Sequence, residues 1–123
     1  MPASVLVVDR DPATCDMLRD FLELEGFAVS CERDEAAAWG AIERGRFAVV
    51  VLEASPAVGF GTDLLRTLGR DRPGLPVVPI TSDGIHRSGL GRPALLKPFD
   101  LEVRLDHVRA ALDLNPLRAS IAS

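Results

Sequence analysis

The sequence contains few of the residues that several classes of protein require. It has only two cysteines among 123 residues, Cys15 and Cys31. Their spacing fits neither the C-x-x-C of a zinc site nor a disulfide framework, so we expect two reduced thiols. It has no cluster of lysine and arginine, and its net charge is −4 at pH 7. Contact with nucleic acid phosphates needs such a cluster, so we expect no direct binding of nucleic acid.

Long apolar runs are also missing. No stretch approaches the length that spans a membrane, and the N-terminus lacks the basic flank and apolar core of a signal peptide. We therefore expect no membrane partner and a cytoplasmic location. Hydrophobic residues still make up 47% of the chain, which is enough for one compact core. The sequence predicts a single domain over residues 1–114, followed by a C-terminal tail over residues 115–123.

Short apolar segments alternate with amphipathic ones along the chain, which is typical of repeated βα units. The apolar segments, which we expect to be strands, are 4–9, 27–31, 47–53, 76–81 and 94–97. Such units form a parallel sheet covered by helices on both faces. The fourth strand is unusual because Pro79 lies within it, and a proline normally occurs at the edge of a sheet or at a bulge.

Capping residues and apolar spacing predict where the helices begin and end. A first helix should begin at Asp11 and Pro12 and end at Gly26. In the second helix Ala38, Trp39 and Ile42 should face inward, and in the third Leu64, Leu65 and Leu68. The remaining ranges are about 34–45 for the second helix, 61–70 for the third and 100–114 for the last. Residues 82–93 contain three glycines and a proline, so the helix expected between Thr81 and Lys97 should be short or irregular.

Charged and hydroxyl side chains follow the predicted strands at the points where these end. In chain order they are Asp9, Arg10 and Asp11, then Glu53, then Thr81 and Ser82, and finally Lys97. The functional crevice of a doubly wound parallel sheet lies at the carboxyl ends of its strands. The sequence therefore predicts that these residues converge on one rim. A plainer alternative is a solvated rim with weak ion pairs, in which the Thr81 hydroxyl only satisfies backbone groups.

The segments "VLVVDRDP", "FAVVVLEASPAVGFGTDLLR", "PVVPITS" and "LLKPFD" resemble the receiver domain of two-component response regulators over nearly the whole chain. The resemblance implies an α/β flavodoxin-like fold, a doubly wound five-stranded parallel sheet in the order 2-1-3-4-5. It also implies an Mg²⁺ site made by an acidic pair after the first strand, and a phosphoryl-accepting aspartate at the end of the third. A threonine and a lysine after strands four and five would contact the phosphate.

The chain departs from this pattern where the chemistry takes place. Asp9 matches the first acid, but Arg10 replaces the second, and Glu53 stands at the phospho-acceptor position. Thr81 and Lys97 match, whereas the aromatic switch position is Ala94. The glycines at 59 and 61 do not complete a G-x-G-x-x-G fingerprint, because the sixth position is a leucine.

Arg10 offers no oxygen ligand to Mg²⁺, and its guanidinium suits a carboxylate. We predict that it pairs with Glu53 or Asp9, that metal binding is lost, and that the chain has no bound cofactor and no catalytic residue. Glu53 is also one methylene longer than aspartate, which misplaces its oxygens for in-line phosphoryl transfer. The site of Asp9, Arg10, Asp11, Thr81, Ser82 and Lys97 is then vestigial.

These observations predict an atypical receiver-like signalling domain that is not an enzyme. It would act through a protein partner, such as a histidine kinase or another signalling protein, or as a homodimer, independently of Mg²⁺-dependent aspartyl phosphorylation. Two alternatives stay open: a pseudo-receiver that binds a small ligand, and a receiver still phosphorylated weakly at Glu53.

Overall fold

The computed structural model describes residues 3–56, 59–81 and 95–96. The predictions for the fourth helix, the last helix and the tail, and for Ser82, Ala94 and Lys97, lie outside these residues. Among the described residues, no helix is long and apolar enough to cross a membrane.

A parallel sheet forms the centre of the molecule. Its strands are β1 (Ser4–Val8), β2 (Ala28–Glu32), β3 (Val49–Glu53), β4 (Val77–Thr81) and the two-residue β5 (Leu95–Leu96). They lie in the order β2-β1-β3-β4-β5, and each of these neighbouring strands pairs with the next in parallel. Valine and leucine fill β1 and β3, whose residues from Val5 to Val8 and from Val49 to Glu53 are all buried, as expected for strands covered on both faces. The predicted flavodoxin-like α/β architecture is confirmed.

Three helices connect the strands: α1 (Pro12–Leu24), α2 (Glu35–Arg44) and α3 (Thr62–Asp71). Asp11 caps α1 and Asp34 caps α2, each with a side-chain oxygen that accepts a hydrogen bond from a backbone amide of the first turn. Pro12 follows its cap at the first helical position, where its missing N–H costs no hydrogen bond. The predicted starts of the first two helices are thus confirmed.

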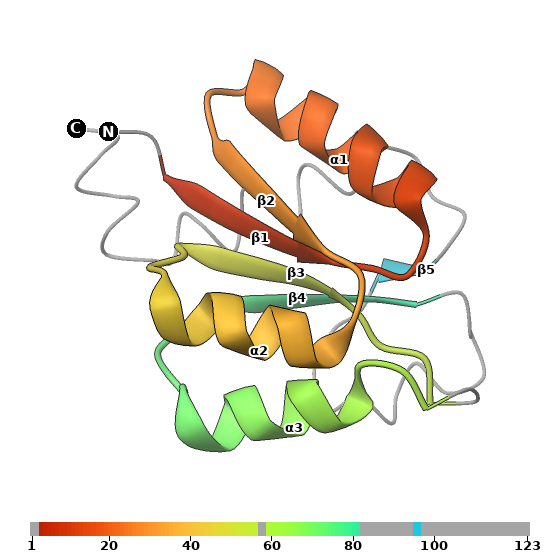
Figure 1. Ribbon diagram of the computed structural model, residues 1–123, viewed down its shortest axis with the longest axis vertical. Helices are drawn as coiled ribbons and strands as arrows, with labels where there is room; N and C mark the ends of the chain where they lie inside the picture. The colour runs from red at the N-terminus through yellow and green to blue at the C-terminus, as the bar shows by residue number, and fades with distance from the viewer. Residues whose placement is uncertain (1–2, 57–58, 82–94, 97–123) are drawn as a thin grey trace.

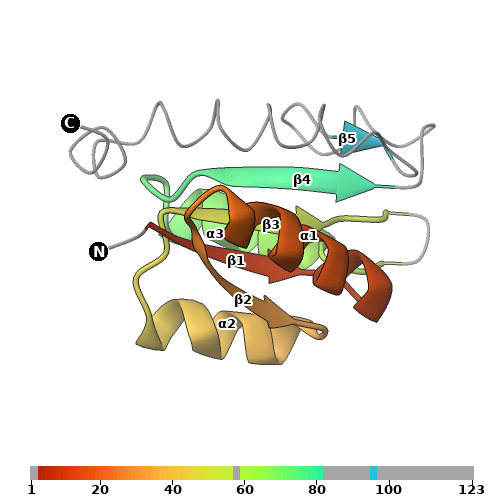
Figure 2. The same ribbon diagram turned by 90° about the horizontal axis from the view of Figure 1, so that it is seen from above.

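The helices lie on both faces of the sheet, α1 on one and α2 and α3 on the other (Figures 1 and 2). Two apolar clusters result. The first joins α1 to β1, β3 and β4 through residues such as Leu18, Leu22 and Val51, and the second joins α2 and α3 to the opposite face through Ile42, Leu52 and Leu68. All three leucines predicted to face inward on α3 are buried. Trp39 of α2 is only partly buried, so the prediction that it faces the core is correct only in part.

Pro79 lies inside β4 and not at a sheet edge or bulge, where we had expected it. Its neighbours explain why the sheet accepts it. The carbonyls of Pro76 and Ile80 accept hydrogen bonds from the backbone amides of Val50 in β3 and of Ala54 directly after it. The backbone groups of alternate residues in a strand are directed toward opposite neighbouring strands. The backbone nitrogen of Pro79 is therefore directed toward β5, and the pairing of β4 with β5 begins one residue later, at Ile80. Its missing N–H removes no bond from the β3 ladder.

Candidate functional site

Two acidic residues lie side by side at the carboxyl ends of the two central strands. Val8 of β1 pairs with Leu52 of β3, so Asp9 and Glu53, each one residue further on, reach the same level. The exposed fraction is 0% for Asp9 and 4% for Glu53. Buried carboxylates need partners, because burial removes the water that would solvate their charge. The contacts of Glu53 therefore decide what this edge of the sheet can do.

Arg10 donates three hydrogen bonds to the Glu53 carboxylate. Its backbone N–H donates to Oε1 at 3.1 Å, its Nε donates to the same oxygen at 3.1 Å, and its Nη2 donates to Oε2 at 2.9 Å. Two parallel N–H donors of the guanidinium thus meet both oxygens, the strongest form of an arginine–carboxylate pair. This geometry confirms that Arg10 pairs with Glu53, one of the two partners that the sequence predicted.

The two side chains of the pair differ in exposure. The Arg10 side chain is 45% exposed, whereas that of Glu53 is 5% exposed. The hydrogen bonds that Arg10 donates to Glu53 raise the pKa of Arg10 above its usual value, burial opposes this only in part, and the charges of Glu53 and Asp9 raise the pKa further. Arg10 therefore stays cationic, and it presents a charge to solvent on one side and to a buried carboxylate on the other.

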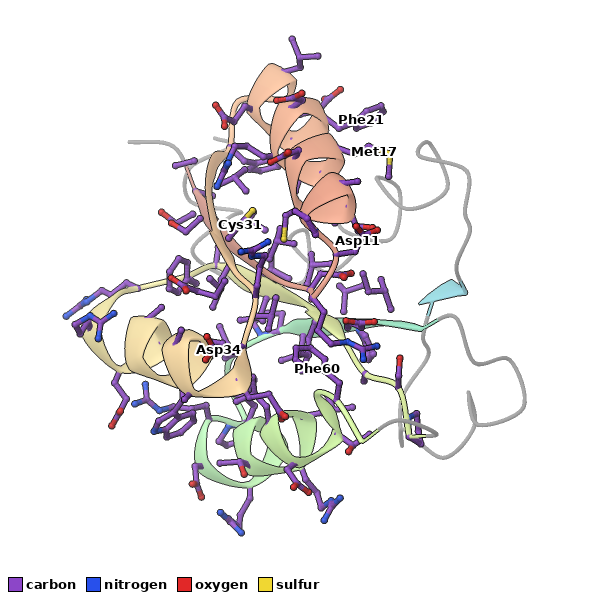
Figure 3. The ribbon with its side chains drawn as sticks, turned by 45° about the vertical axis from the view of Figure 1, so that its right-hand side comes forward. Asp11, Met17, Phe21, Cys31, Asp34 and Phe60 are labelled. Carbon is purple, nitrogen blue, oxygen red and sulfur yellow. The ribbon has the colours of Figure 1, made fainter. Side chains whose placement is uncertain are left out.

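Phe60 covers the Arg10 guanidinium from the loop that follows β3. Its ring centroid lies 4.9 Å from the Arg10 Cζ, within the range of a cation–π contact. An antiparallel bridge between Ser55 and Phe60 folds this loop back on itself, with Ser55 N donating to the Phe60 carbonyl at 2.8 Å. Figure 3 shows Phe60 near the strand ends, between the sheet and α3.

Gly61 allows this loop to close. Its φ is +80°, and a Cβ at this position would collide with the backbone carbonyl of Glu53. The glycines around Phe60 are evident in the sequence, but the contact of its ring with Arg10 was not predicted. The available signal was an aromatic residue in a short loop directly after the strand that carries Glu53.

The two acids that flank Arg10 have different roles. The Asp11 backbone N–H donates to Asp9 Oδ1 at 2.9 Å, which holds the Asp9 carboxylate against the turn after β1. The Asp11 carboxylate turns away to cap α1, accepting from Ala13 N at 3.1 Å and from the Thr14 hydroxyl at 2.9 Å. Asp11, which was predicted as part of the site, thus uses both carboxylate oxygens to begin the helix.

The structure brings Asp9, Arg10 and Glu53 together as predicted. The backbone of Thr81 ends β4 next to them, since Ile80 pairs with Glu53 in the sheet. Ser82, Ala94 and Lys97 lie outside the described residues, so their predicted places at this rim stay predictions.

The described residues do not fit an Mg²⁺ ion, which the family resemblance implies. Mg²⁺ requires hard oxygen ligands in near-octahedral geometry. Here a permanently charged guanidinium donates one hydrogen bond to each oxygen of Glu53. A cation beside these oxygens repels a dication and competes for the same acceptors.

The sequence is similar to regulatory proteins, although no family model matches it. It is 34% identical over 117 residues to the probable transcriptional regulatory protein TcrX of Mycobacterium tuberculosis, covering 90% of this chain and 50% of that protein. It is 33% identical over 118 residues to a response regulator MprA of a Mycobacterium species, covering 91% of this chain and 51% of that protein. The chain thus spans about half the length of the curated relatives it matches.

Solved structures share the fold. A response regulator receiver domain protein (CheY-like) from Methanospirillum hungatei has a TM-score of 0.80 at 24% identity, covering 92% of this chain and 95% of that one. The response regulator protein TrrA from Thermotoga maritima, in complex with Mg²⁺ and BeF, has a TM-score of 0.80 at 18% identity, covering 89% of this chain and 99% of that one.

Proposed function

We propose that this chain is a domain of the response regulator receiver (CheY-like) type, a proposal that its sequence similarity and its fold support. It is an atypical receiver that signals through contact with a protein partner in the cytoplasm, without enzymatic activity of its own and without a bound metal. Its strand-end site is held in one arrangement by Arg10, so that Mg²⁺-dependent phosphorylation is not part of its signalling.

The ion pair between Arg10 and Glu53 is the observation that supports this proposal. A phosphodonor would have to reach an oxygen of Glu53, yet both oxygens accept hydrogen bonds from Arg10. Phosphoryl transfer depends on positioning and on a metal that neutralises the developing charge. Arg10 supplies a permanent positive charge at this place, so the charge of Glu53 is balanced without Mg²⁺.

Intact-mass measurement after incubation with Mg²⁺ and acetyl phosphate tests the proposal. The wild-type mass should stay unchanged under conditions in which an ordinary receiver domain gains one phosphoryl group. A phosphoryl adduct on the wild type that disappears in Glu53→Gln would overturn the proposal and favour a receiver that is phosphorylated at Glu53.

Calorimetry with Mg²⁺ gives a second test of the same site. The wild type should show no site-specific binding at millimolar Mg²⁺, whereas the double variant Arg10→Asp, Glu53→Asp restores two short carboxylates and should bind the ion measurably. The double change is needed because either substitution alone leaves half of the site unsuited to the metal. Clear binding by the wild type would refute the role given to Arg10.

The partner is a histidine kinase or another signalling protein, and a second copy of the chain is the other candidate that we keep. The relatives matched over half of their length are regulators by name, and one matched over 25% of its length is named a DNA-binding transcriptional regulator. Contact with DNA does not belong to the proposed role of this domain, whose net charge is −4. Light scattering of the purified chain at increasing concentration distinguishes a homodimer from a monomer that needs a different partner.

A further inference from the structure

The two cysteines lie together between α1 and the edge strand β2. Cys15 belongs to the first turn of α1 and is 3% exposed, whereas Cys31 belongs to β2 and is partly exposed. The Cys31 thiol donates to the backbone carbonyl of Cys15 at 3.6 Å, so the two residues are in direct contact. Figure 3 shows Cys31 beside the first turns of α1. Residues 16 positions apart in the sequence thus form one pair of neighbouring thiols.

A surface hollow of about 250 Å³ opens onto this pair. It is lined by both cysteines together with Pro12, Asp16, Arg19 and Arg33. The Arg19 side chain is 39% exposed and pairs with Asp16 and Glu23 at 3.9 Å. Arg33 is exposed, so the lining of the hollow carries two cations and one carboxylate. A reagent that carries carboxylates is attracted to such a place more than a neutral one.

We propose that Cys15 and Cys31 form a thiol–disulfide exchange site that reacts with a small disulfide bearing carboxylates and closes into a reversible bond between α1 and β2. Cys31 is the attacking residue because it is the more exposed thiol, and Cys15 is the resolving residue because it is buried behind it. This site is separate from Arg10 and Glu53, and the proposal does not depend on the function proposed above.

The reaction balances in two steps. The Cys31 thiol loses its proton to solvent, and the thiolate attacks one sulfur of the small disulfide, which forms a mixed disulfide and releases one small thiolate. The Cys15 thiol then loses its proton, and its thiolate attacks the Cys31 sulfur and expels the second small thiolate. The released thiolates take up the two protons, so that the protein is oxidised by two electrons and the small disulfide is reduced to two thiols.

Burial makes this exchange slow at neutral pH. It raises the pKa of Cys15 to about 12 and raises the pKa of Cys31 as well, while Arg19 lowers both in part. Only a small fraction of each thiol is ionised at pH 7, and the thiolate is the nucleophile. The rate should therefore rise with pH by close to tenfold per unit while the attacking thiol stays mostly protonated.

The bond would alter the region next to the strand-end site. The Cys15 thiol donates to the backbone carbonyl of Asp9 at 3.6 Å, one residue before Arg10. A disulfide consumes this donor and ties the start of α1 to β2. Oxidation of the two thiols would thus change the contacts of the segment that carries Asp9 and Arg10.

Oxidised glutathione, a disulfide with several carboxylates, is the probe that tests the proposal. The folded wild type, Cys15→Ala and Cys31→Ala are incubated with it at pH 8.5, and their intact masses are followed. The wild type should lose two hydrogen atoms and retain no glutathione. Cys15→Ala should retain one glutathione on Cys31, and Cys31→Ala should stay unmodified because Cys15 is buried.

Two controls make the result decisive. Each variant is also treated in urea, where every remaining cysteine should react, which shows that the folded structure sets the order of attack. Arg33→Ala should slow the reaction with oxidised glutathione several-fold but leave the rate with neutral hydroxyethyl disulfide unchanged. The proposal is overturned if the folded wild type stays reduced or keeps a bound glutathione, or if Cys31→Ala reacts as fast as Cys15→Ala.

Discussion

Replacing Arg10 with alanine removes two of the three hydrogen bonds that Arg10 donates to Glu53, since the backbone N–H remains. The carboxylate itself cannot escape into water, because the Glu53 side chain is only 5% exposed. The substitution should therefore lower the free energy of unfolding and leave the fold intact.

The exposure of Arg10 and of Glu53 sets how much the free energy of unfolding should fall. Breaking a fully buried pair costs about 3–5 kcal/mol, and an exposed pair is worth about 0–1 kcal/mol. Arg10 is 45% exposed, so water can partly replace its guanidinium after the substitution. We expect a loss on the order of 1–3 kcal/mol, which includes roughly 0.5–1 kcal/mol from the contact with Phe60.

Urea unfolding at pH 7, followed by circular dichroism, measures this loss. Arg66→Ala is the matched control, because Arg66 pairs with Asp63 through side chains that are 77% and 82% exposed. That variant should stay within about 0.5 kcal/mol of the wild type. A double-mutant cycle of Arg10→Ala with Glu53→Gln isolates the pair and should give a coupling energy above about 1 kcal/mol. If Arg10→Ala costs no more than Arg66→Ala, the guanidinium is solvated and does not hold the site.

Three further outcomes follow from other contacts. Phe60→Leu keeps an apolar side chain but removes the ring from Arg10, so urea melts should show a loss of roughly 0.5–1 kcal/mol that is absent when Arg10 is already alanine. Gly61→Ala should cost about 1–3 kcal/mol or more in the same assay, since it combines a positive φ with a collision at the Glu53 carbonyl, whereas Gly74→Ala, where a Cβ meets open space, should be close to neutral. The pKa of Cys15, raised to about 12 by burial, lies above its unfolded value of roughly 8.5, so the stabilisation is complete below that lower value and is lost as pH rises through the folded pKa. Between pH 7 and pH 10 the wild type should lose on the order of 1–2 kcal/mol more than Cys15→Ala. The chain has no tyrosine whose titration in this pH range would obscure the comparison. Equal losses in the two proteins would show that Cys15 ionises freely in the folded state.

The sequence alone determined the local structure and the end of the sheet at which the candidate site lies. Apolar runs of the right length became β1 to β4, and the aspartates at 11 and 34 began α1 and α2, because capping and side-chain alternation act within a few residues of the chain. The parallel arrangement then fixed which residues could meet, since Asp9, Arg10 and Glu53 follow strands that are neighbours in the sheet. Their convergence and the attraction between Arg10 and an acid were predictable from residue type and position.

Only the tertiary structure decided between partners that the sequence left equivalent. Arg10 had two carboxylates within reach. In the structure its guanidinium donates to Glu53, whereas Asp9 accepts a hydrogen bond from the Asp11 backbone N–H. Phe60 reaches Arg10 because the loop after β3 turns back at Gly61, and the two thiols meet because α1 packs on β2. These contacts join segments far apart in the chain, so they depend on how the loop and the helix lie on the sheet, which no short stretch of sequence specifies.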